Sequence, residues 1–179
     1  GGGRDLIFPH HENEIAQSEA AYGREPFCGW WLHNGMLALD GVKMSKSLGN
    51  LVLARELMTR YEPDHLRLYL LSTHLRADAN YHEGDIDALG GRFERLRAAA
   101  TREDAAAAAV DGAVLRAFRA TMDEDFDVPG ALDVLDEAAR GVIAGSAGSG
   151  APAEVRAALA TLGFAFAGAR GPATGDLTP

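Results

Sequence analysis

Residues 37–57, LALDGVKMSKSLGNLVLAREL, decide the fold, because the chain changes character within them. Asp40-Gly41 lies between two apolar runs, and an Asp-Gly pair in that setting is a strong signal for a tight β-hairpin. We therefore predict strands within residues 27–42, followed by a polar loop. From Leu51 onward the apolar residues have helical spacing. The sequence thus predicts an α/β segment followed by an all-α segment.

The segment before this hairpin is predicted to contain one further strand and one helix. RDLIF, residues 4–8, is typical of a short buried strand, with the glycines before it as a loop. Residues 10–22 are predicted to form a helix, since Pro9 suits its first turn and Gly23 suits its end.

The segment after the polar loop is predicted to be a helical bundle. Apolar residues recur there at i, i+3, i+4 and i+7, and Pro63 and Pro129 suit the first turns of two helices. GSAGSGAP, residues 145–152, is typical of a flexible linker. Residues 155–166 form a last amphipathic stretch, and the tail at 168–179 is expected to be disordered.

Four acidic residues lie close together before Pro129. They are spaced rather like the ligands of a calcium loop, but the glycine and the distal glutamate of such a loop are missing. We therefore predict a helix-capping turn at Asp123, Glu124, Asp125 and Asp127.

Composition excludes several classes of protein. The 179 residues are 47% apolar and 24% charged, as in ordinary globular proteins, and no apolar run approaches the roughly 20 residues of a membrane span. We expect no secretory signal, because no long apolar stretch follows the first arginine. The single cysteine, Cys28, excludes an intrachain disulfide, so we expect a reducing, cytoplasmic location. The net charge of −9 gives no general attraction to nucleic acid, so any RNA contact must be local and built on arginines.

The basic residues are strongly biased. Of the 17, fifteen are arginine, and the two lysines are Lys43 and Lys46. Two ammonium groups, with the hydroxyls of Ser45 and Ser47, are suited to gripping a polyphosphate on a loop. The alternative interpretation is a polar surface turn.

PHHENE, residues 9–14, is a candidate metal site. On a helix His10 and Glu14 are i and i+4, so they project from one face and could share a zinc ion. His11 and Glu14, at i and i+3, are a second option. Two ligands do not complete a zinc site, and the alternative is a solvated helix face.

The N-terminal residues 1–5, GGGRD, are a candidate nucleotide loop. Glycines such as Gly2 and Gly3 let the backbone approach a ligand closely, and Asp5 could accept hydrogen bonds from ribose hydroxyls. The chain begins with these glycines instead of methionine, so we expect it to be part of a longer protein.

Together these motifs resemble the cysteinyl-tRNA synthetases, which are class I aminoacyl-tRNA synthetases. Lysine loops of this kind are shared across class I synthetases, whereas PHHENEIAQSE is the most specific element. The resemblance extends over about residues 1–145 and is carried by GGGRDLIFPHHENEIAQSEA (1–20), WWLHNGMLALDGVKMSKSLGN (30–50), LRLYLLSTHLRADANY (66–81) and AFRATMDEDFDVPGALDVL (117–135).

The resemblance implies ATP-dependent joining of L-cysteine to its tRNA. Family members form cysteinyl-adenylate and pyrophosphate and then transfer the cysteinyl group to the tRNA. Lys43 and Lys46 match the catalytic loop, with Lys46 the one that acts on ATP. Gly2, Gly3 and Asp5 match the loop that lines the adenosine ribose.

The resemblance also implies a zinc ion that binds the substrate thiolate. Of its four family ligands, the histidine and the glutamate match His10 and Glu14, and Cys28 matches neither cysteine. Those two cysteines and the family's histidine–isoleucine–glycine–histidine stretch are absent from this chain. We therefore expect the chain alone to be inactive and to need the N-terminal half of the enzyme.

The resemblance implies a partial Rossmann-like catalytic segment followed by a helical bundle. We divide the chain into the C-terminal part of the catalytic domain with the lysine loop (1–50), a helical stem-contact region (51–144), and a linker, short helix and tail (145–179).

Two other functions stay open at this point. The ligase that joins cysteine to an amino-sugar–inositol in mycothiol synthesis shares the lysine loop and the GGG-x-D-L-x-F-P-H-H-E start, but PHHENEIAQSEA keeps the second glutamate, which favours the tRNA enzyme. A non-catalytic helical module that binds protein or RNA is the third hypothesis. Such a module would not need both lysines in an arginine-biased sequence.

Overall fold

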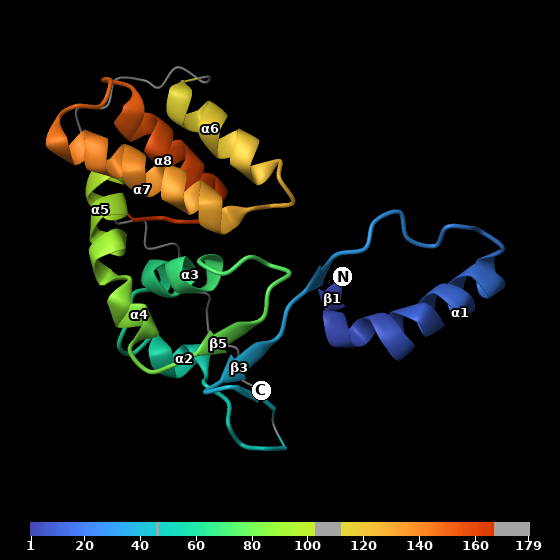
Figure 1. Ribbon diagram of the computed structural model, residues 1–179. Helices are drawn as coiled ribbons and strands as arrows, with labels where there is room; N and C mark the ends of the chain where they lie inside the picture. The colour runs from blue at the N-terminus through green and yellow to red at the C-terminus, as the bar shows by residue number, and fades with distance from the viewer. Residues whose placement is uncertain (46, 103–111, 167–179) are drawn as a thin grey trace, which may run out of the picture.

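The computed structural model describes residues 1–45, 47–102 and 112–166 (Figure 1). The first part of the chain forms β1 (Gly2–Gly3), η1 (Arg4–Leu6), η2 (Ile7–His11), α1 (Glu12–Tyr22), β2 (His33–Asn34), β3 (Leu37–Leu39) and β4 (Val42–Lys43). The second part forms α2 (Ala54–Leu57), α3 (Pro63–Leu71), β5 (Ala79–Tyr81), α4 (Asp85–Ala88), α5 (Gly90–Ala100), α6 (Ala113–Met122), α7 (Val128–Ala144) and α8 (Ala151–Thr161). The tail predicted to be disordered at 168–179 lies outside the described residues.

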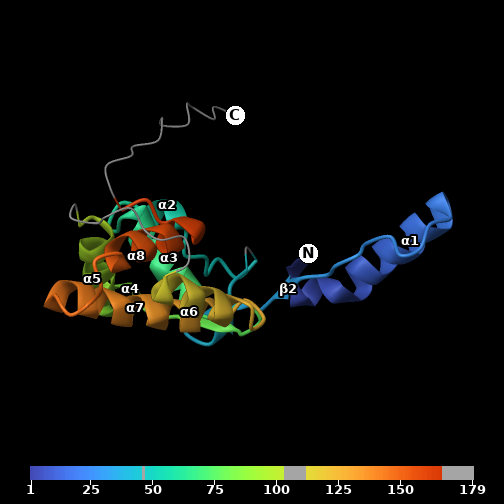
Figure 2. The ribbon, with the colours of Figure 1, turned by 90° about the horizontal axis from the view of Figure 1, so that it is seen from above.

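Residues 1–34 form an N-terminal arm that extends away from the other elements (Figures 1 and 2). Its two short strands, β1 and β2, pair in parallel, with Gly2 opposite His33 and Gly3 opposite Asn34. The strand predicted at residues 4–8 is wrong, because η1 and the start of η2 occupy that stretch. Phe8 alone is extended there, and it is 75% exposed. A short apolar run does not by itself distinguish a buried strand from an exposed turn.

The helix predicted over residues 10–22 is confirmed. It consists of the end of η2 and the whole of α1, and Gly23 closes it with φ +60°. The Gly23 N–H donates to the Glu19 carbonyl at 2.9 Å, which satisfies one of the free carbonyls at the helix end. The strands predicted within 27–42 begin only at His33, since residues 27–32 contain none.

The hairpin predicted at Asp40-Gly41 is confirmed. β3 and β4 pair antiparallel, and both turn residues have positive φ, 49° and 81°, as a type I′ turn requires. β3 also pairs in parallel with β5, which gives the sheet order β4-β3-β5. The expectation that the chain is all helical after Leu51 is therefore wrong. β5 has three residues, too few for an alternating pattern to reveal it in the sequence.

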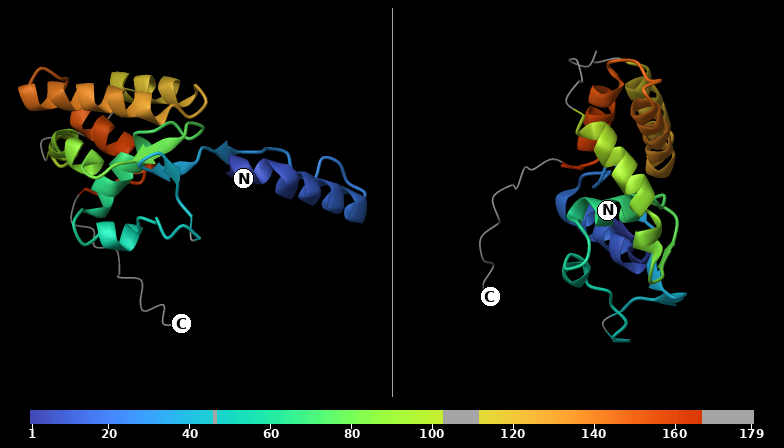
Figure 3. Two further views of the ribbon diagram at one scale, coloured as in Figure 1. Left: turned by 60° about the horizontal axis from the view of Figure 1, so that its bottom comes forward. Right: turned by 90° about the vertical axis from the view of Figure 1, so that its left-hand side faces the viewer.

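The main core lies between α5, α6, α7 and α8 (Figures 1 and 3). The helix starts predicted at Pro63 and Pro129 are confirmed in α3 and α7. The linker predicted at 145–152 is too long, because α8 already begins at Ala151, which is buried. Large buried side chains of this core are Phe93, Leu96, Leu115, Phe118, Leu132, Leu135, Val155 and Leu159. In the described part of the chain, no helix is long and apolar enough to cross a membrane.

Two carboxylates cap the N-termini of helices in the bundle. Asp127 precedes α7, and its side chain accepts a hydrogen bond from the Gly130 N–H at 3.0 Å, so the predicted capping turn is confirmed. Glu154 lies on α8, is buried, and accepts from the N–H groups of Val114 and Leu115 in the first turn of α6 at 3.0 and 3.1 Å. α8 thus supplies the N-terminal cap of α6.

Removing the Glu154 carboxylate should destabilise the bundle. Glu154→Ala leaves two backbone N–H groups without their acceptor, so we expect the free energy of unfolding to fall by roughly 1–3 kcal/mol in urea denaturation. Glu154→Gln keeps an acceptor and should cost less. Glu137→Ala, on the exposed face of α7, is the control and should change stability by less than about 0.5 kcal/mol. Equal stability of the alanine variant and the control would contradict this assignment.

The connecting segment, residues 72–82, joins the β3–β4 hairpin to the helices. Gly35 donates to the Leu75 carbonyl at 2.7 Å, and Ala79 donates to the Met36 carbonyl at 2.9 Å. The Asp78 carboxylate accepts from the Met36 N–H at 2.8 Å and forms an ion pair with Arg4 of the arm. The connecting segment therefore contacts both the arm and the start of the hairpin and fixes them next to each other.

The same segment reaches the bundle on its other side. Arg76 forms two hydrogen bonds with the Asp125 carboxylate, at 2.6 and 2.7 Å, in the turn between α6 and α7. His74 contacts the Asp125 carbonyl at 3.0 Å. The Asn80 side chain accepts from the Gly41 N–H at 2.7 Å, which supports the hairpin turn.

Substituting Asp78 should loosen the junction without unfolding the bundle. In Asp78→Ala the Met36 N–H loses its acceptor, and we expect amide hydrogen exchange at Ala79, whose own bond is untouched, to rise about tenfold. Asp133→Ala, which removes the ion pair between the exposed Asp133 of α7 and Arg92 of α5, should leave exchange at Ala79 unchanged. Unchanged exchange in Asp78→Ala would mean that the backbone bonds alone hold the junction.

Candidate functional site

The glycine loop, residues 1–5, is tightly packed around Gly2 and Gly3. A Cβ on Gly2 would lie 2.8 Å from a methyl carbon of Leu6. A Cβ on Gly3 would lie 2.6 Å from Oδ1 of Asp5. Real Cβ atoms do not approach so closely, so a side chain at either position would displace the Leu6 or Asp5 side chain from the place that it occupies here. The Asp5 carboxylate thus folds back over the backbone of Gly3.

Asp5 joins the glycine loop to the lysine loop, residues 43–50. Its Oδ2 lies 3.0 Å from Nζ of Lys43, the last residue of β4. The hydrogen bond from Lys43 is the main cause that lowers the pKa of Asp5 below its ordinary value. The neighbouring Arg4 is directed instead to Asp78. Two motifs 38 residues apart in sequence therefore meet through one ion pair.

The lysine loop is closed by a residue that sequence reasoning did not single out, Asn50. Its side-chain oxygen accepts from the Ser45 N–H at 2.9 Å, and its side-chain nitrogen donates to the Lys43 carbonyl at 3.2 Å. The Ser45 and Ser47 hydroxyls are 3.2 Å apart. The signal for Asn50 was its place directly after Gly49, which turns the chain with φ +66°. Lys46 lies outside the described residues.

Met44 anchors the loop on the apolar side. It packs with a small core made by Leu66, Tyr81 and Ile86. Beside it is a cavity of about 140 Å³ with apolar walls, which include Val52. The loop thus carries polar groups above an apolar base.

His10 and Glu14, the candidate zinc ligands, are both exposed, in η2 and α1 respectively. Cys28 does not join them, since its Sγ donates to the Trp30 carbonyl at 3.0 Å. The described residues contain no group of three or more histidine, cysteine or acidic side chains placed to hold a metal. Imidazole and carboxylate suit zinc chemically, but these two residues do not by themselves make up a site.

A histidine pair lies beneath the glycine loop. His11 Nδ1 and His33 Nε2 are 2.8 Å apart, and the Trp31 ring is nearly parallel to His33 with centroids 5.9 Å apart. Burial, and then the charge of His11, lowers the pKa of His33. A Cβ on Gly2 would lie 3.4 Å from His11, so the pair supports the glycine loop from below. Sequence reasoning missed the pair because it depends on how residues 23–32 return the chain to β1.

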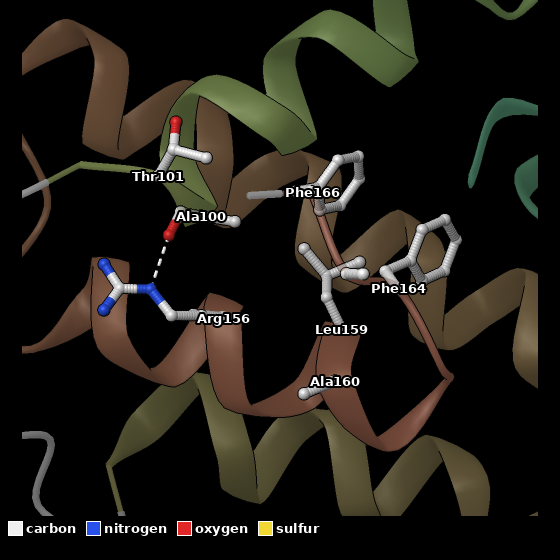
Figure 4. A pocket seen from close by; sticks show the side chains of 8 residues that line it. Ala100, Thr101, Arg156, Leu159, Ala160, Phe164 and Phe166 are labelled. Atoms are coloured by element: carbon white, nitrogen blue, oxygen red, sulfur yellow. Dashed lines mark hydrogen bonds between the residues drawn. The ribbon is translucent and has the colours of Figure 1, made fainter. Parts of the chain in front are cut away.

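A larger pocket, of about 510 Å³, lies far from these loops, between α5, α8 and residues 164–166 (Figure 4). Its walls are mostly apolar and include Leu159 and Phe166. Its charged residue, Arg156, donates to the carbonyls of Ala100 and Arg102 at the end of α5, at 2.5 and 2.7 Å. This guanidinium holds α5 to α8, so the pocket is a packing feature and not a candidate active site.

Removing the Asn50 side chain should open the lysine loop. Asn50→Ala loses both bonds that bridge the loop, whereas Asn50→Asp keeps the acceptor for Ser45. A protease that cleaves after lysine has only two sites in this chain, both in the loop. We expect cleavage of the alanine variant to be about tenfold faster than that of the unsubstituted chain, with the aspartate variant between them. Equal rates for all three would show that Asn50 does not restrain the loop.

Comparison with known families gives a match over the first half of the chain. The family described as tRNA synthetases class I (C) catalytic domain matches residues 1–90. Among curated proteins, the cysteine--tRNA ligase of Haemophilus influenzae is 45% identical over 141 residues, which are 78% of this chain and 30% of that protein. The cysteine--tRNA ligase of Actinobacillus pleuropneumoniae is 46% identical over 143 residues, 79% of this chain and 31% of that protein.

A further relative and a solved structure extend the match. The cysteine--tRNA ligase of a Polaromonas species is 41% identical over 165 residues, 91% of this chain and 34% of that protein. The chain therefore spans about a third of the length of these relatives. The agnB2 LeuRS of Agrobacterium radiobacter K84, solved in a ternary complex with tRNA and LeuAMS, has a TM-score of 0.58 over 90% of this chain and 25% of its own. Its sequence identity is 17%, so this likeness concerns the fold alone.

Proposed function

The chain belongs to the class I tRNA synthetases, and on that basis we propose that it carries part of the catalytic site of a cysteine--tRNA ligase. The observation that carries the proposal is the contact between Asp5 and Lys43, which brings the glycine loop and the lysine loop together. A ribose-binding carboxylate and a phosphate-binding loop must lie side by side to hold one ATP molecule. The 41–46% identity to cysteine--tRNA ligases supports cysteine as the amino acid.

The proposed reaction has two steps. The carboxylate of cysteine attacks the α-phosphate of ATP and gives cysteinyl-adenylate and pyrophosphate. A ribose hydroxyl at the end of the tRNA then attacks the cysteinyl carbonyl and releases AMP. Negative charge grows on the leaving pyrophosphate in the first step, and a fixed ammonium group nearby stabilises it.

Each named residue has a proposed role in the first step. Gly2 and Gly3 are proposed to let the adenosine approach the backbone, because glycine has no side chain of its own to hold a ligand away. Asp5, ionised and about half exposed, accepts from a ribose hydroxyl. Lys46 is proposed to bind the phosphates, together with the hydroxyls of the lysine loop.

His10 and Glu14 remain our candidates for two of the four ligands of a zinc ion. Both are exposed and of suitable ligand type. The other ligands would come from outside the described residues. A zinc ion bound there would supply a soft partner for the thiolate of cysteine, which serine cannot match.

The N-terminal arm supports a further polypeptide partner. It exposes several large apolar side chains, and β1 and β2 pair only with each other among the described strands. Such a surface is normally covered. We propose that it packs against the N-terminal half of the enzyme, and that the helices beyond β4 contact the tRNA. The exposed residues include Phe8, Tyr22, Phe27, Trp30 and Leu32.

The domain limits at residues 50 and 144 and the cytoplasmic location stay predictions. The curated relatives compared above are all cysteine--tRNA ligases, so neither the amino-sugar ligase nor the non-catalytic module is retained.

A chimera tests the proposal. In the Haemophilus influenzae cysteine--tRNA ligase, the aligned 141-residue segment is replaced by the matching segment of this chain. We expect cysteine-dependent exchange of labelled pyrophosphate into ATP within about tenfold of the parent enzyme. Lys46→Ala in the chimera should lower the exchange rate by about 10²-fold or more, as losing one charge-stabilising donor commonly does.

The control is the 179-residue chain alone. It should give only background exchange, because we expect the N-terminal half of the enzyme to supply further groups that bind ATP and zinc. A chimera that is folded by circular dichroism but inactive would overturn the proposed function. Robust exchange by the chain alone would overturn the need for the N-terminal half.

A further inference from the structure

We propose that Lys43 acts at the ribose end of ATP, as a positioning residue for the Asp5 carboxylate, and not on the phosphates. The inference rests on the proposed function. It assigns the two lysines of the loop to different parts of ATP, Lys43 to the ribose and Lys46 to the phosphates. It differs from the sequence-based expectation, which placed both lysines in the catalytic machinery.

The geometry around Asp5 carries the inference. Oδ2 lies 3.0 Å from Lys43 Nζ, and Oδ1 is directed back over Gly3. One oxygen of the carboxylate is therefore held by an ammonium group, and the other faces the backbone of Gly3. The side chains of Lys43 and Asp5 are 58% and 46% exposed, so a ligand still has access to the carboxylate. A carboxylate has about four lone-pair positions, enough for Lys43 and a ribose hydroxyl together.

Lys43 is fixed at its backbone. It is the last residue of β4, where it pairs with Ala38 of β3. Its carbonyl accepts from the Asn50 side chain, and the next residue, Met44, donates to the Leu37 carbonyl at 3.3 Å. Because strand pairing fixes the backbone of Lys43, its ammonium group is suited to a partner that stays in one place. The ribose site is stationary, whereas a phosphate group that leaves during the reaction is not.

The Asp5–Lys43 ion pair orients the Asp5 carboxylate and adds little to the stability of the fold. An exposed pair adds little to folding, because solvent screens it. The hydrogen bond from Lys43 lowers the pKa of Asp5 and keeps one oxygen in a defined direction. Its benefit is therefore expected in ATP binding, where a preoriented acceptor loses less entropy on meeting the ribose.

The choice of lysine over arginine supports the same role. The chain uses arginine at fifteen of its 17 basic positions, yet residue 43 is lysine. A guanidinium tends to take both oxygens of a carboxylate, as Arg76 does with Asp125. An ammonium group binds one carboxylate oxygen and leaves the other oxygen free to bind a ligand. Arginine at position 43 would compete with the ribose for Asp5.

The test compares ATP with 2′-deoxy-ATP and 3′-deoxy-ATP in pyrophosphate exchange by the chimera. Lys43→Ala should raise KM for ATP about tenfold and change kcat less than about twofold, since a charge-assisted contact in binding is lost. With the analogue that lacks the contacted hydroxyl, the same substitution should change KM less than about twofold. Asp5→Asn together with Lys43→Ala should be no worse than Asp5→Asn alone.

Two further variants separate this role from others. Lys43→Arg should fail to restore KM for ATP, whereas a residue that only supplies charge near phosphates would tolerate arginine. Lys46→Ala should reduce kcat equally with all three nucleotides. Arg140→Ala, which removes the ion pair between the exposed Arg140 and Asp136 in α7, is the matched control and should leave KM and kcat unchanged.

The outcomes distinguish this inference from the proposed function. A Lys43→Ala penalty that is equal for all three nucleotides and adds to that of Asp5→Asn would place Lys43 on the phosphates and overturn the inference alone. An unsubstituted chimera that is folded but inactive would overturn the proposed function and, with it, the inference.

Discussion

The parallel pairing of β3 with β5 is the constraint on which the rest of the structure depends. It places the β3–β4 hairpin, and hence the start of the lysine loop, against the segment that enters the helices. The pairing requires Gly35, because a Cβ there would lie 1.9 Å from the Ala77 carbonyl oxygen. With no side chain at that position, the Gly35 N–H reaches the Leu75 carbonyl and the two backbones approach closely. The hairpin that leads into the lysine loop is therefore positioned by backbone contacts.

The arginines of the helical region serve mainly as connectors. All three arginines of α5 are paired with carboxylates, two of them with aspartates of α7 and the third, Arg97, with Glu62 and Glu94. The Arg95–Asp136 pair is the least exposed of these. Burial raises the pKa of Asp136, but the hydrogen bonds from Arg95 and Arg140 together outweigh it and leave that pKa below its ordinary value. This use of arginine fits the acidic net charge of −9. A nucleic acid that approached α5 would have to compete with these carboxylates for the arginines.

Features with a local cause could be predicted from the sequence. The Asp40-Gly41 hairpin, the end of α1 at Gly23, the proline-initiated helices and the Asp127 cap each depend on residues within a few positions of one another. β5 and the place of α8 depended on distant partners, whereas the strand wrongly predicted at residues 4–8 came from the local ambiguity of a short apolar run. β5 exists because β3 lies beside it, and α8 belongs to the bundle because Glu154 caps α6.

The candidate site divides in the same way. The lysine bias and the glycine loop identified Asp5 and Lys43 separately, but their contact depends on folding across 38 residues. The His11–His33 pair was missed for the same reason. His10 and Glu14 have the right helical spacing, but spacing within one element does not supply the remaining ligands of a metal.

Stability and the proposed chemistry lie in different parts of this molecule. The buried side chains are concentrated in the helical bundle, and the loops of the candidate site are held by backbone pairing and by exposed polar contacts. Exposed ion pairs contribute about 0–1 kcal/mol, whereas truncating a buried leucine costs about 2–5 kcal/mol. Substitutions at Asp5 or Lys43 should therefore leave the fold intact. Because of this separation, a change in KM or kcat in such a variant reports on the site itself and not on loss of folded protein.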